Sequence, residues 1–256
     1  MKIALVQFDI AWENVAGNLA AIEAQLKQVS KDTDVVVLPE MFTTGFTMNP
    51  EKYAHRNPDE VLQHMKKWSA IGNYLIVGSI PLEEGGKFYN RLYWVKPSGE
   101  VGSYNKRHLF RMAGEDQHYA AGEEKCIVSW RNVTFSFQIC YDLRFPVWSR
   151  NTEQADVLVY VANWPAVRIS AWDKLLAARA IENLCYTVGV NRVGTDANGI
   201  EHNGHSMAYD FIGNPMGTFL EGQGVLEYQI DTPALTAFRQ KFPAHLDADQ
   251  FDIRIE

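Results

Sequence analysis

Cysteine is scarce in this chain of 256 residues, which contains only Cys126, Cys140 and Cys185. The number is odd and no Cys-x-x-Cys pair occurs, so we expect neither a disulfide framework nor a cysteine-based zinc site. Few, unpaired cysteines are typical of proteins that stay in a reducing compartment. The cysteine content therefore predicts a cytoplasmic protein.

Long apolar runs are also missing. No uncharged apolar stretch approaches the ~18 residues that a membrane-spanning helix needs, and the best candidate, residues 157–167, is interrupted by Asn163 and Pro165. The first residues include Asp9 and Glu13 and lack the apolar centre of a secretory signal. We therefore expect no membrane partner.

An excess of positive charge is absent as well. The chain has 24 Lys and Arg residues against 31 Asp and Glu residues, for a formal net charge of −7. Nucleic-acid binders usually carry basic residues in excess, so no nucleic-acid partner is expected. With 46% hydrophobic and 21% charged residues, the composition is that of an ordinary globular protein.

The most familiar catalytic motifs do not occur. Residues 204–208, Gly-His-Ser-Met-Ala, lack the last glycine of Gly-x-Ser-x-Gly, and the chain has no His-Glu-x-x-His, P-loop or complete Gly-x-Gly-x-x-Gly. These absences argue against a simple serine hydrolase, a zinc protease and a nucleotide-binding protein. His108, His118 and His205 lack metal-ligand spacing, so we interpret them as polar loop residues and predict no metal site.

What the sequence does contain is a succession of strands interleaved with fewer helices. Apolar runs and alternating patterns predict strands over residues 2–8, 34–38, 74–80, 88–95, 101–104, 127–130, 133–139, 157–162, 186–191, 206–211 and 224–230. Periodicity and caps predict helices over residues 15–29, 58–71 and 170–183, another from about residue 145, and a short one before the tail, with 41–56 and 106–123 irregular. Since no linker or repeat interrupts them, we predict one α/β domain over residues 1–256, with a core over about 3–235 and a tail over 242–256.

Three reactive side chains follow predicted strands of this domain, namely Glu40, Lys106 and Cys140. Open α/β sheets bind their ligands at such strand ends. A carboxylate there can act as a general base, and a fixed ammonium can stabilise an oxyanion. A thiol at a corner between a strand and a helix is favoured as the thiolate by the helix dipole. Each residue alone has an ordinary structural explanation, but together they predict a nucleophilic site.

The segments around these residues resemble the three signature blocks of the nitrilase, or carbon–nitrogen hydrolase, superfamily. The segments are Val36-Val37-Leu38-Pro39-Glu40, Tyr104-Asn105-Lys106-Arg107-His108-Leu109-Phe110 and Ile139-Cys140-Tyr141-Asp142-Leu143-Arg144-Phe145-Pro146. The order Glu, Lys, Cys is that of the superfamily, and residues 179–183 and 204–206 resemble its later blocks. The resemblance covers about residues 3–245 and is strongest to the omega-amidases, which hydrolyse monoamides of dicarboxylic acids such as 2-oxoglutaramate.

This resemblance implies a four-layer αββα sandwich that works without a metal or organic cofactor. It implies that Glu40 takes the thiol proton and later activates water, and that Cys140 attacks the amide carbonyl. Lys106 and the backbone N–H of Tyr141 would then hold the oxyanion.

A second glutamate often lies between the lysine and the cysteine in members of this superfamily. Glu115 is its best match here, with Glu123 and Glu124 as rivals. The chain departs from the pattern at Val147, where many members carry a glutamate after the Arg-Phe-Pro segment.

A dicarboxylate monoamide needs a cationic or hydrogen-bonding group at the far end of its pocket. Arg168 is a candidate for that group, and Trp164 and Phe42 follow strand ends and are expected to wall the pocket. Two alternatives stay open: a relative that hydrolyses nitriles or N-carbamoyl compounds with the same triad, and a catalytically silent ligand-binding oligomer of this fold. A Cys–His protease is disfavoured because nothing in the sequence places a histidine beside Cys140.

The end of the chain predicts a contact between subunits. The tail cannot continue the last predicted helix past Pro243, yet its Phe242, Leu246 and Phe251 favour burial. Terminal segments fray unless something holds them. Because such tails cross a twofold interface in relatives of this fold, we expect a homodimer, to which Trp148 also contributes.

Overall fold

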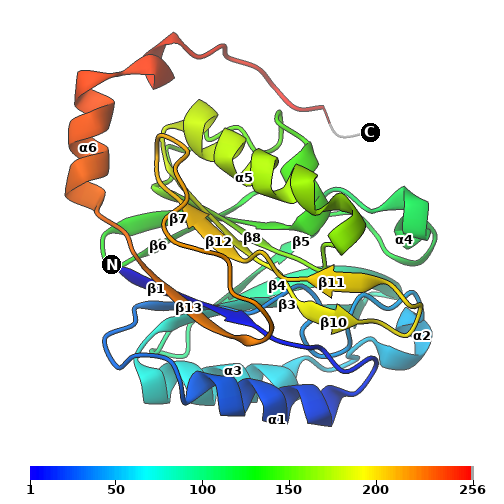
Figure 1. The fold of residues 1–256 in the computed structure, drawn as a ribbon. Coiled ribbons are helices and arrows are strands. Elements are labelled where there is room, and N and C mark those ends of the chain that lie inside the picture. The colour runs from blue at the N-terminus through cyan, green and yellow to red at the C-terminus, as the bar shows by residue number, and fades with distance from the viewer. Residues whose placement is uncertain (255–256) are drawn as a thin grey trace.

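The computed structural model of the chain describes residues 1–254. Two β-sheets lie face to face (Figure 1). Helices α1 (Val15–Leu26) and α3 (Asp59–Gly72) cover the outside of one sheet, and α5 (Ile169–Asn183) covers the outside of the other. Helix, sheet, sheet and helix therefore form four layers, and the predicted αββα sandwich is confirmed.

The first sheet has six strands. In spatial order they are β13 (Gly224–Gln229), β1 (Lys2–Gln7), β2 (Val35–Val37), β3 (Leu75–Glu84), β4 (Lys87–Val95) and β5 (Val101–Asn105). β1, β2 and β3 run parallel, whereas β13, β4 and β5 pair antiparallel with their neighbours. Because the direction reverses twice between β3 and β5, the carboxyl ends of β2, β3 and β5 lie at the same edge of the sheet.

The second sheet has five strands. In spatial order they are β12 (Met207–Tyr209), β9 (Tyr186–Val190), β8 (Val157–Val161), β7 (Val133–Ile139) and β6 (Cys126–Trp130). β7, β8 and β9 run parallel, and β6 and β12 form antiparallel edges. Arg131 and Asn132 connect β6 to β7 with φ values of 48° and 63°, as a tight hairpin turn requires. β10 (Val193–Thr195) and β11 (Glu201–Asn203) form a separate hairpin.

Alternate residues of the central strands pack into two different cores. Ile3 and Leu5 of β1 belong to the core between the two sheets. Ala4 and Val6 belong to the core between the first sheet and its helices. Because both faces of the sheet are covered, its central strands are apolar throughout.

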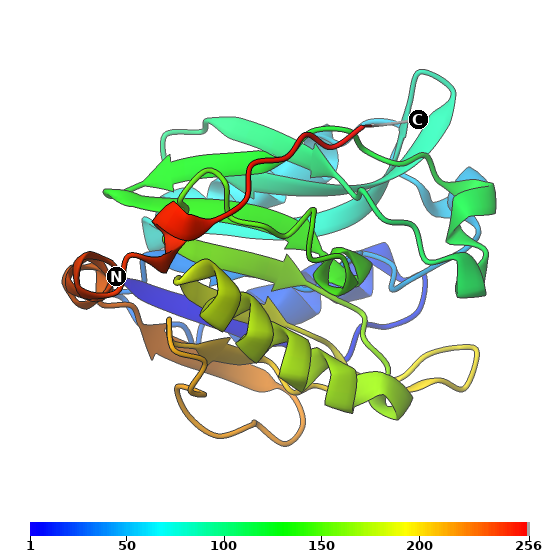
Figure 2. The same cartoon turned by 90° about the horizontal axis from the view of Figure 1, so that it is seen from above.

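Short helical segments connect the larger elements. They are α2 (Pro50–Tyr53), η1 (Arg111–Ala113), α4 (Glu115–His118), η2 (Cys140–Arg144), η3 (Ala166–Arg168) and η4 (Ala244–Asp247). α6 (Thr232–Lys241) leaves the sandwich, and the tail after it returns over the face that carries α5 (Figures 1 and 2). Of the helices formed by residues 1–254, none has both the length and the apolar character to cross a membrane.

The helix predicted from about residue 145 is wrong. The chain after β7 forms the five-residue 3-10 turn η2 and then turns over residues 146–149. Pro146 disfavours a helical conformation of the residue before it, and Phe145 is extended, with φ −108° and ψ 95°. The sequence also missed α2 and the β10–β11 hairpin, whose strands of three residues are too short for an alternating pattern.

Four strands from both sheets end at one end of the sandwich. Glu40 follows β2, Lys106 follows β5, Cys140 follows β7 and Asn163 follows β8. Hydrogen bonds join residues of the two sheets there, because the backbone N–H of Asn163 donates to the Glu40 carboxylate. The fold thus gathers at one place the three side chains that the sequence singled out.

Candidate active site

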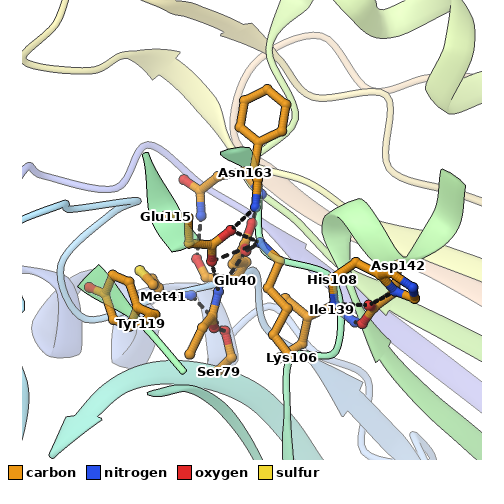
Figure 3. A network of polar contacts seen from close by, with 12 residues as sticks. Glu40, Met41, Ser79, Lys106, His108, Glu115, Tyr119, Ile139, Asp142 and Asn163 are labelled. Atoms are coloured by element: carbon orange, nitrogen blue, oxygen red, sulfur yellow. Dashed lines mark hydrogen bonds and ion pairs between the residues drawn. The ribbon is translucent and has the colours of Figure 1, made fainter. Parts of the chain in front are cut away.

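A lysine ammonium lies between two carboxylates at this end of the sandwich (Figure 3). Lys106 Nζ is 2.8 Å from Glu40 Oε1 and 2.9 Å from Glu115 Oε2. All three side chains are fully buried. Glu115, at the start of α4, also accepts a hydrogen bond of 2.6 Å from the backbone N–H of Phe110. The structure therefore brings together three of the four residues predicted to be catalytic.

The charges of these three groups act on one another. Burial would lower the pKa of Lys106, but the carboxylates of Glu115 and Glu40 outweigh burial and raise it. Burial raises the pKa of Glu115; Lys106 opposes that rise, and Glu40 adds to it. The ammonium therefore stays charged while the two carboxyl groups share it as their counter-ion.

Further hydrogen bonds hold Glu40 in one orientation. Asn90 Nδ2 donates to its Oε1 at 2.7 Å, and the backbone N–H of Asn163 donates to its Oε2 at 2.8 Å. The next residue, Met41, has a φ of 42°, a conformation that costs a non-glycine residue roughly 1–3 kcal/mol. Its N–H donates to Ser79 Oγ at 2.9 Å. These contacts fix the direction of the carboxylate, as a general base requires.

The backbone of Cys140 is also in a left-handed conformation, with a φ of 44°. Asp142 holds this turn, because its Oδ2 accepts from the N–H of Ile139 at 3.0 Å and from the hydroxyl of Tyr104 at 2.7 Å. Its Oδ1 accepts from the backbone N–H of His108 at 2.9 Å. Since Tyr104 and His108 flank the buried lysine in sequence, one carboxylate ties the cysteine turn to the lysine segment (Figure 3).

The thiol of Cys140 is not favoured as the thiolate, contrary to the sequence-based expectation. Burial raises its pKa well above the usual range, and the Glu40 carboxylate adds to the effect, whereas Lys106 opposes it. The turn η2 that follows β7 has only five residues, so the helix dipole expected to favour the thiolate is not formed there. The thiol therefore stays protonated at neutral pH and needs a base during attack.

A small pocket borders Cys140 and Lys106. Its volume of about 70 Å³ is well below the roughly 300–1,000 Å³ of pockets for drug-sized ligands. Aromatic and cationic side chains make most of its wall, including Phe46, Phe110, Tyr141, Arg144, Trp164 and Arg168. Larger grooves lie between α1 and α3 and beside the tail, but none of the four predicted catalytic residues lines them.

Two of these wall residues are arginines that form no ion pair with an acidic residue among residues 1–254. The guanidinium of Arg144 lies 4.9 Å from the ring centre of Trp164, and that of Arg168 lies 5.1 Å from the ring centre of Phe110. The arginine ion pairs found among residues 1–254 involve other arginines. Burial lowers the pKa of Arg168, and the charge of Arg144 adds to this effect. The wall also includes Asp196, so the pocket offers an anionic group two arginines beside one carboxylate.

The assignment of Phe42 to the pocket wall is wrong. Phe42 is fully buried in the core between the first sheet and its helices. Its ring lies on Gly78 of β3, where an added Cβ would approach Phe42 to 2.7 Å. The phenylalanine that lines the pocket is Phe46. The sequence located the strand end but not the direction in which each side chain of the following loop points.

Other residues singled out in the sequence lie away from this pocket. Glu123 and Glu124 are exposed, and of the three candidate glutamates Glu115 is the one that contacts the ammonium. His205 Nδ1 lies 3.1 Å from the Asp173 carboxylate. Within residues 1–254, no three His, Cys, Asp or Glu side chains are placed to hold a metal ion together.

Besides Phe46, sequence reasoning missed Asn90, Arg144, Asn163 and His202 among the residues of this site. Asn90 is a buried polar residue inside the strand β4, and such a residue needs a polar partner, which was a usable signal. Arg144 stands four positions after Cys140 in the segment that resembles the superfamily. From the sequence, Asn163 only marks the end of a predicted strand. His202 belongs to the short hairpin that the sequence did not predict.

The assembled groups can perform acyl transfer. The thiol of Cys140 lies beside the Glu40 carboxylate, which can take its proton. The ammonium of Lys106 lines the same pocket, where it can stabilise a negative charge on oxygen. Tyr141, the second residue of η2, lines the pocket, and the first amides of a helical turn have no acceptor within the turn.

Comparisons with known proteins agree with this chemistry. The carbon–nitrogen hydrolase family model matches residues 2–240. Omega-amidase YafV of Yersinia enterocolitica is 44% identical to the chain over 98% of both sequences, and 2-oxoglutaramate amidase of Bacillus subtilis is 32% identical over 96% of both. Among solved structures, XC1258 from Xanthomonas campestris matches the chain with a TM-score of 0.96, 39% identity and 99% coverage of both chains. That structure is described as a CN-hydrolase superfamily protein with an arsenic adduct in its active site.

Proposed function

Because this chain belongs to the carbon–nitrogen hydrolase family, we propose that it is a cysteine-dependent amidase that converts the monoamide of a small dicarboxylic acid to the dicarboxylate and ammonia. The relatives named omega-amidase and 2-oxoglutaramate amidase support this substrate class. The observation that carries it is the presence of Arg144 and Arg168 in the same small pocket as Cys140. An arginine pair binds a carboxylate strongly and in a defined orientation.

The first half of the reaction forms a thioester. Glu40 takes the thiol proton while the sulfur of Cys140 bonds to the amide carbon, and the carbonyl electrons move onto oxygen. Lys106 and the backbone N–H of Tyr141 stabilise this oxyanion. When the carbonyl re-forms, the C–N bond breaks, and Glu40 returns the proton to the nitrogen, which leaves as ammonia. By an alternative route, Glu40 passes the thiol proton through the Lys106 ammonium to Glu115, which then gives it to the nitrogen.

The second half of the reaction hydrolyses the thioester. Glu40 takes a proton from water, whose oxygen bonds to the acyl carbon, and Lys106 again faces the oxyanion. The C–S bond then breaks, the sulfur of Cys140 regains a proton from Glu40, and the acid departs. Glu115 keeps Lys106 charged throughout, so that both oxyanions meet a full positive charge.

The substrate class is tested by separating recognition of the distal carboxylate from chemistry at the amide. We expect Arg144→Gln and Arg168→Gln each to lower kcat/KM for succinamate about 10- to 100-fold, mainly through KM, because each removes a charged hydrogen-bond donor. Butyramide has the same chain length without the carboxylate, and its hydrolysis should change less than about threefold. Ammonia release measures both substrates.

A matched control is Arg111→Gln, because Arg111 lies near the pocket but is exposed and pairs with Asp116. It should leave both substrates unaffected. Equal losses for succinamate and butyramide in the Arg144 and Arg168 variants would contradict the assignment of these arginines to the carboxylate.

We also propose that the protein acts as a cytoplasmic homodimer. Its three cysteines are free, which supports a reducing compartment. Phe242, Leu246 and Phe251 of the tail have exposed fractions of 54%, 73% and 41%, and apolar exposure of this extent on one segment supports an interface. A twofold arrangement would bury the tails of both subunits in one self-complementary patch.

A further inference from the structure

Asn163 is held by Glu40 through both of its N–H groups. Its backbone N–H donates to Glu40 Oε2 at 2.8 Å, and its side-chain Nδ2 donates to the Glu40 carbonyl oxygen. A carbonyl oxygen can only accept hydrogen bonds, so this contact fixes which end of the Asn163 amide is nitrogen. Oδ1, the acceptor end, must therefore point away from that carbonyl.

The Oδ1 atom of Asn163 has no hydrogen-bond partner within the part of the chain that the structure describes. The residue is 94% buried, since its exposed fraction is 6%, and it lines the pocket that contains Cys140 and Lys106. A buried acceptor without a donor is unfavourable and rare in native proteins. Because Asn163 lines the pocket, a ligand bound there can bring the missing donor.

The nitrogens of Lys106 and Asn90, which also contact Glu40, already have acceptors. The Lys106 ammonium is engaged by Glu40 and Glu115, and the amide nitrogen of Asn90 donates to Glu40. The substrate proposed above is different, because its carboxamide carries two N–H groups at the reacting centre. One can face the Glu40 carboxylate, which later returns a proton to this nitrogen, and the other is free for a neighbouring acceptor.

We propose that Asn163 Oδ1 accepts a hydrogen bond from the N–H of the scissile carboxamide and thereby makes the enzyme selective for amides over esters and nitriles. This inference rests on the proposed amidase function and adds a specificity residue to it. Esters and nitriles have no N–H at the reacting carbon, so they leave Oδ1 unpaired. A site built around a substrate N–H discriminates strongly against analogues that lack it.

The test compares two substrates that give the same acyl-enzyme, succinamate and monomethyl succinate, in the wild-type enzyme and in Asn163→Ala. The variant loses the Nδ2 contact with Glu40, which affects both substrates, and the Oδ1 contact, which affects only the amide. We expect the ratio of kcat/KM for the amide to kcat/KM for the ester to fall about 10- to 100-fold. Because partial unfolding lowers both rates equally, the ratio stays informative.

The matched control is Asn90→Ala, which also weakens the hold on Glu40 but leaves Oδ1 of Asn163 in place. It should slow both substrates and keep their ratio within about threefold of wild type. If Asn163→Ala does not fold, Asn163→Leu, which has nearly the same shape, takes its place.

An unchanged amide-to-ester ratio in the Asn163 variant would overturn the inference. The same result is expected if Oδ1 binds the hydrolytic water, because both substrates need that water. That outcome leaves the proposed function standing as long as the wild-type enzyme releases ammonia from succinamate. Failure of the wild-type enzyme to release ammonia from any monoamide would instead overturn the proposed function itself.

Discussion

At the scale of single residues, the site places two carboxylates around one positive charge. Glu40 and Glu115 both contact the ammonium of Lys106, and none of the three reaches solvent. With two carboxylates around one ammonium, a further negative charge on sulfur is unfavourable, and the pKa of Cys140 is raised accordingly by burial and by Glu40. Cys140 is therefore favoured as the thiol, and the proposed reaction depends on proton transfer to Glu40.

The first prediction follows from this dependence. Glu40→Gln preserves the shape of the side chain but cannot accept the thiol proton, so kcat should fall about 10²- to 10⁴-fold. Circular dichroism should show an unchanged fold, and ammonia release gives the rate. A variant in which only KM changed would show that Glu40 binds substrate and is not the base.

At the scale of elements, Glu40, Lys106 and Cys140 follow separate strands, and buried carboxylates connect these segments. Asp142 connects the turn after β7 to the segment after β5 through the N–H of Ile139, the hydroxyl of Tyr104 and the N–H of His108. The left-handed conformation of Cys140 needs such support, because isolated chains rarely adopt it. The geometry of the nucleophile is thus a property of two elements held together.

The second prediction concerns this connection. Asp142→Ala leaves the N–H groups of Ile139 and His108 and the hydroxyl of Tyr104 unpaired and also removes the contact with His108 Nδ1. The free energy of unfolding should therefore fall by roughly 3–5 kcal/mol, and kcat should fall more than KM rises. Denaturant unfolding and steady-state kinetics measure the two effects.

A matched control for Asp142 is Glu227→Ala. Glu227 on β13 also accepts hydrogen bonds from a connecting segment, through Ser30 and Thr33, but it is remote from the pocket. This variant should lose stability and keep its kcat. Equal loss of kcat in both variants would mean that stability alone explains the effect of Asp142.

The third prediction concerns the β10–β11 hairpin and its dependence on pH. Burial, and then the charge of Arg192, lower the pKa of His202 to about 4, whereas an unfolded histidine titrates near 6.5. A depressed pKa stabilises the folded chain above about pH 6.5, and this stability is lost as the pH falls towards 4. Between pH 7 and pH 4.5 the loss is about 2 kcal/mol.

Urea unfolding of the wild-type protein and of His202→Gln at pH 7 and pH 4.5 measures this contribution. The wild-type protein should lose about 2 kcal/mol more than the variant over this range, because all other titrating groups are common to both. If the free energy of unfolding fell equally in both proteins between pH 7 and pH 4.5, the pKa of His202 would not be lowered in the folded protein.

The elements also show what sequence can and cannot predict. β1, β2, β7 and α5 were predicted within a few residues because long apolar runs and helical spacing report on burial. The helix after Cys140 was predicted wrongly because the local polar pattern does not reveal that Asp142 closes a short turn. Phe42 and Phe46 are one helical turn apart in sequence, and only the tertiary packing on Gly78 determines which of them enters the core.

At the scale of the whole molecule, the pocket lies at one end of the sandwich. The C-terminal tail crosses the face that bears α5 (Figure 2). Sequence resemblance predicted the four layers, since three separate segments matched in order. The register between the two sheets, which sets the contact between Glu40 and Asn163, is a long-range property that no local pattern contains.

The fourth prediction concerns assembly. Deleting residues 243–256 removes Leu246 and Phe251 from the proposed interface, so the mass in solution should fall from that of a dimer to that of a monomer, with a lower Tm. Light scattering and thermal melting measure this. A shorter deletion of residues 252–256 keeps both side chains and should remain dimeric. If the longer deletion kept the mass and Tm of the parent, the tail would not be part of the interface.

The central claim is that Cys140 forms a thioester with a dicarboxylate monoamide, and ammonia release across a substrate panel tests it most directly. The panel is succinamate, 2-oxoglutaramate, glutamine, asparagine and simple nitriles, assayed with the wild-type enzyme, Cys140→Ala, Cys126→Ala and Cys185→Ala. We predict rapid release from succinamate or 2-oxoglutaramate, at least about 10⁴-fold loss in Cys140→Ala, and retained activity in the other two cysteine variants. Release from nitriles alone, or undiminished release by Cys140→Ala, would contradict this account.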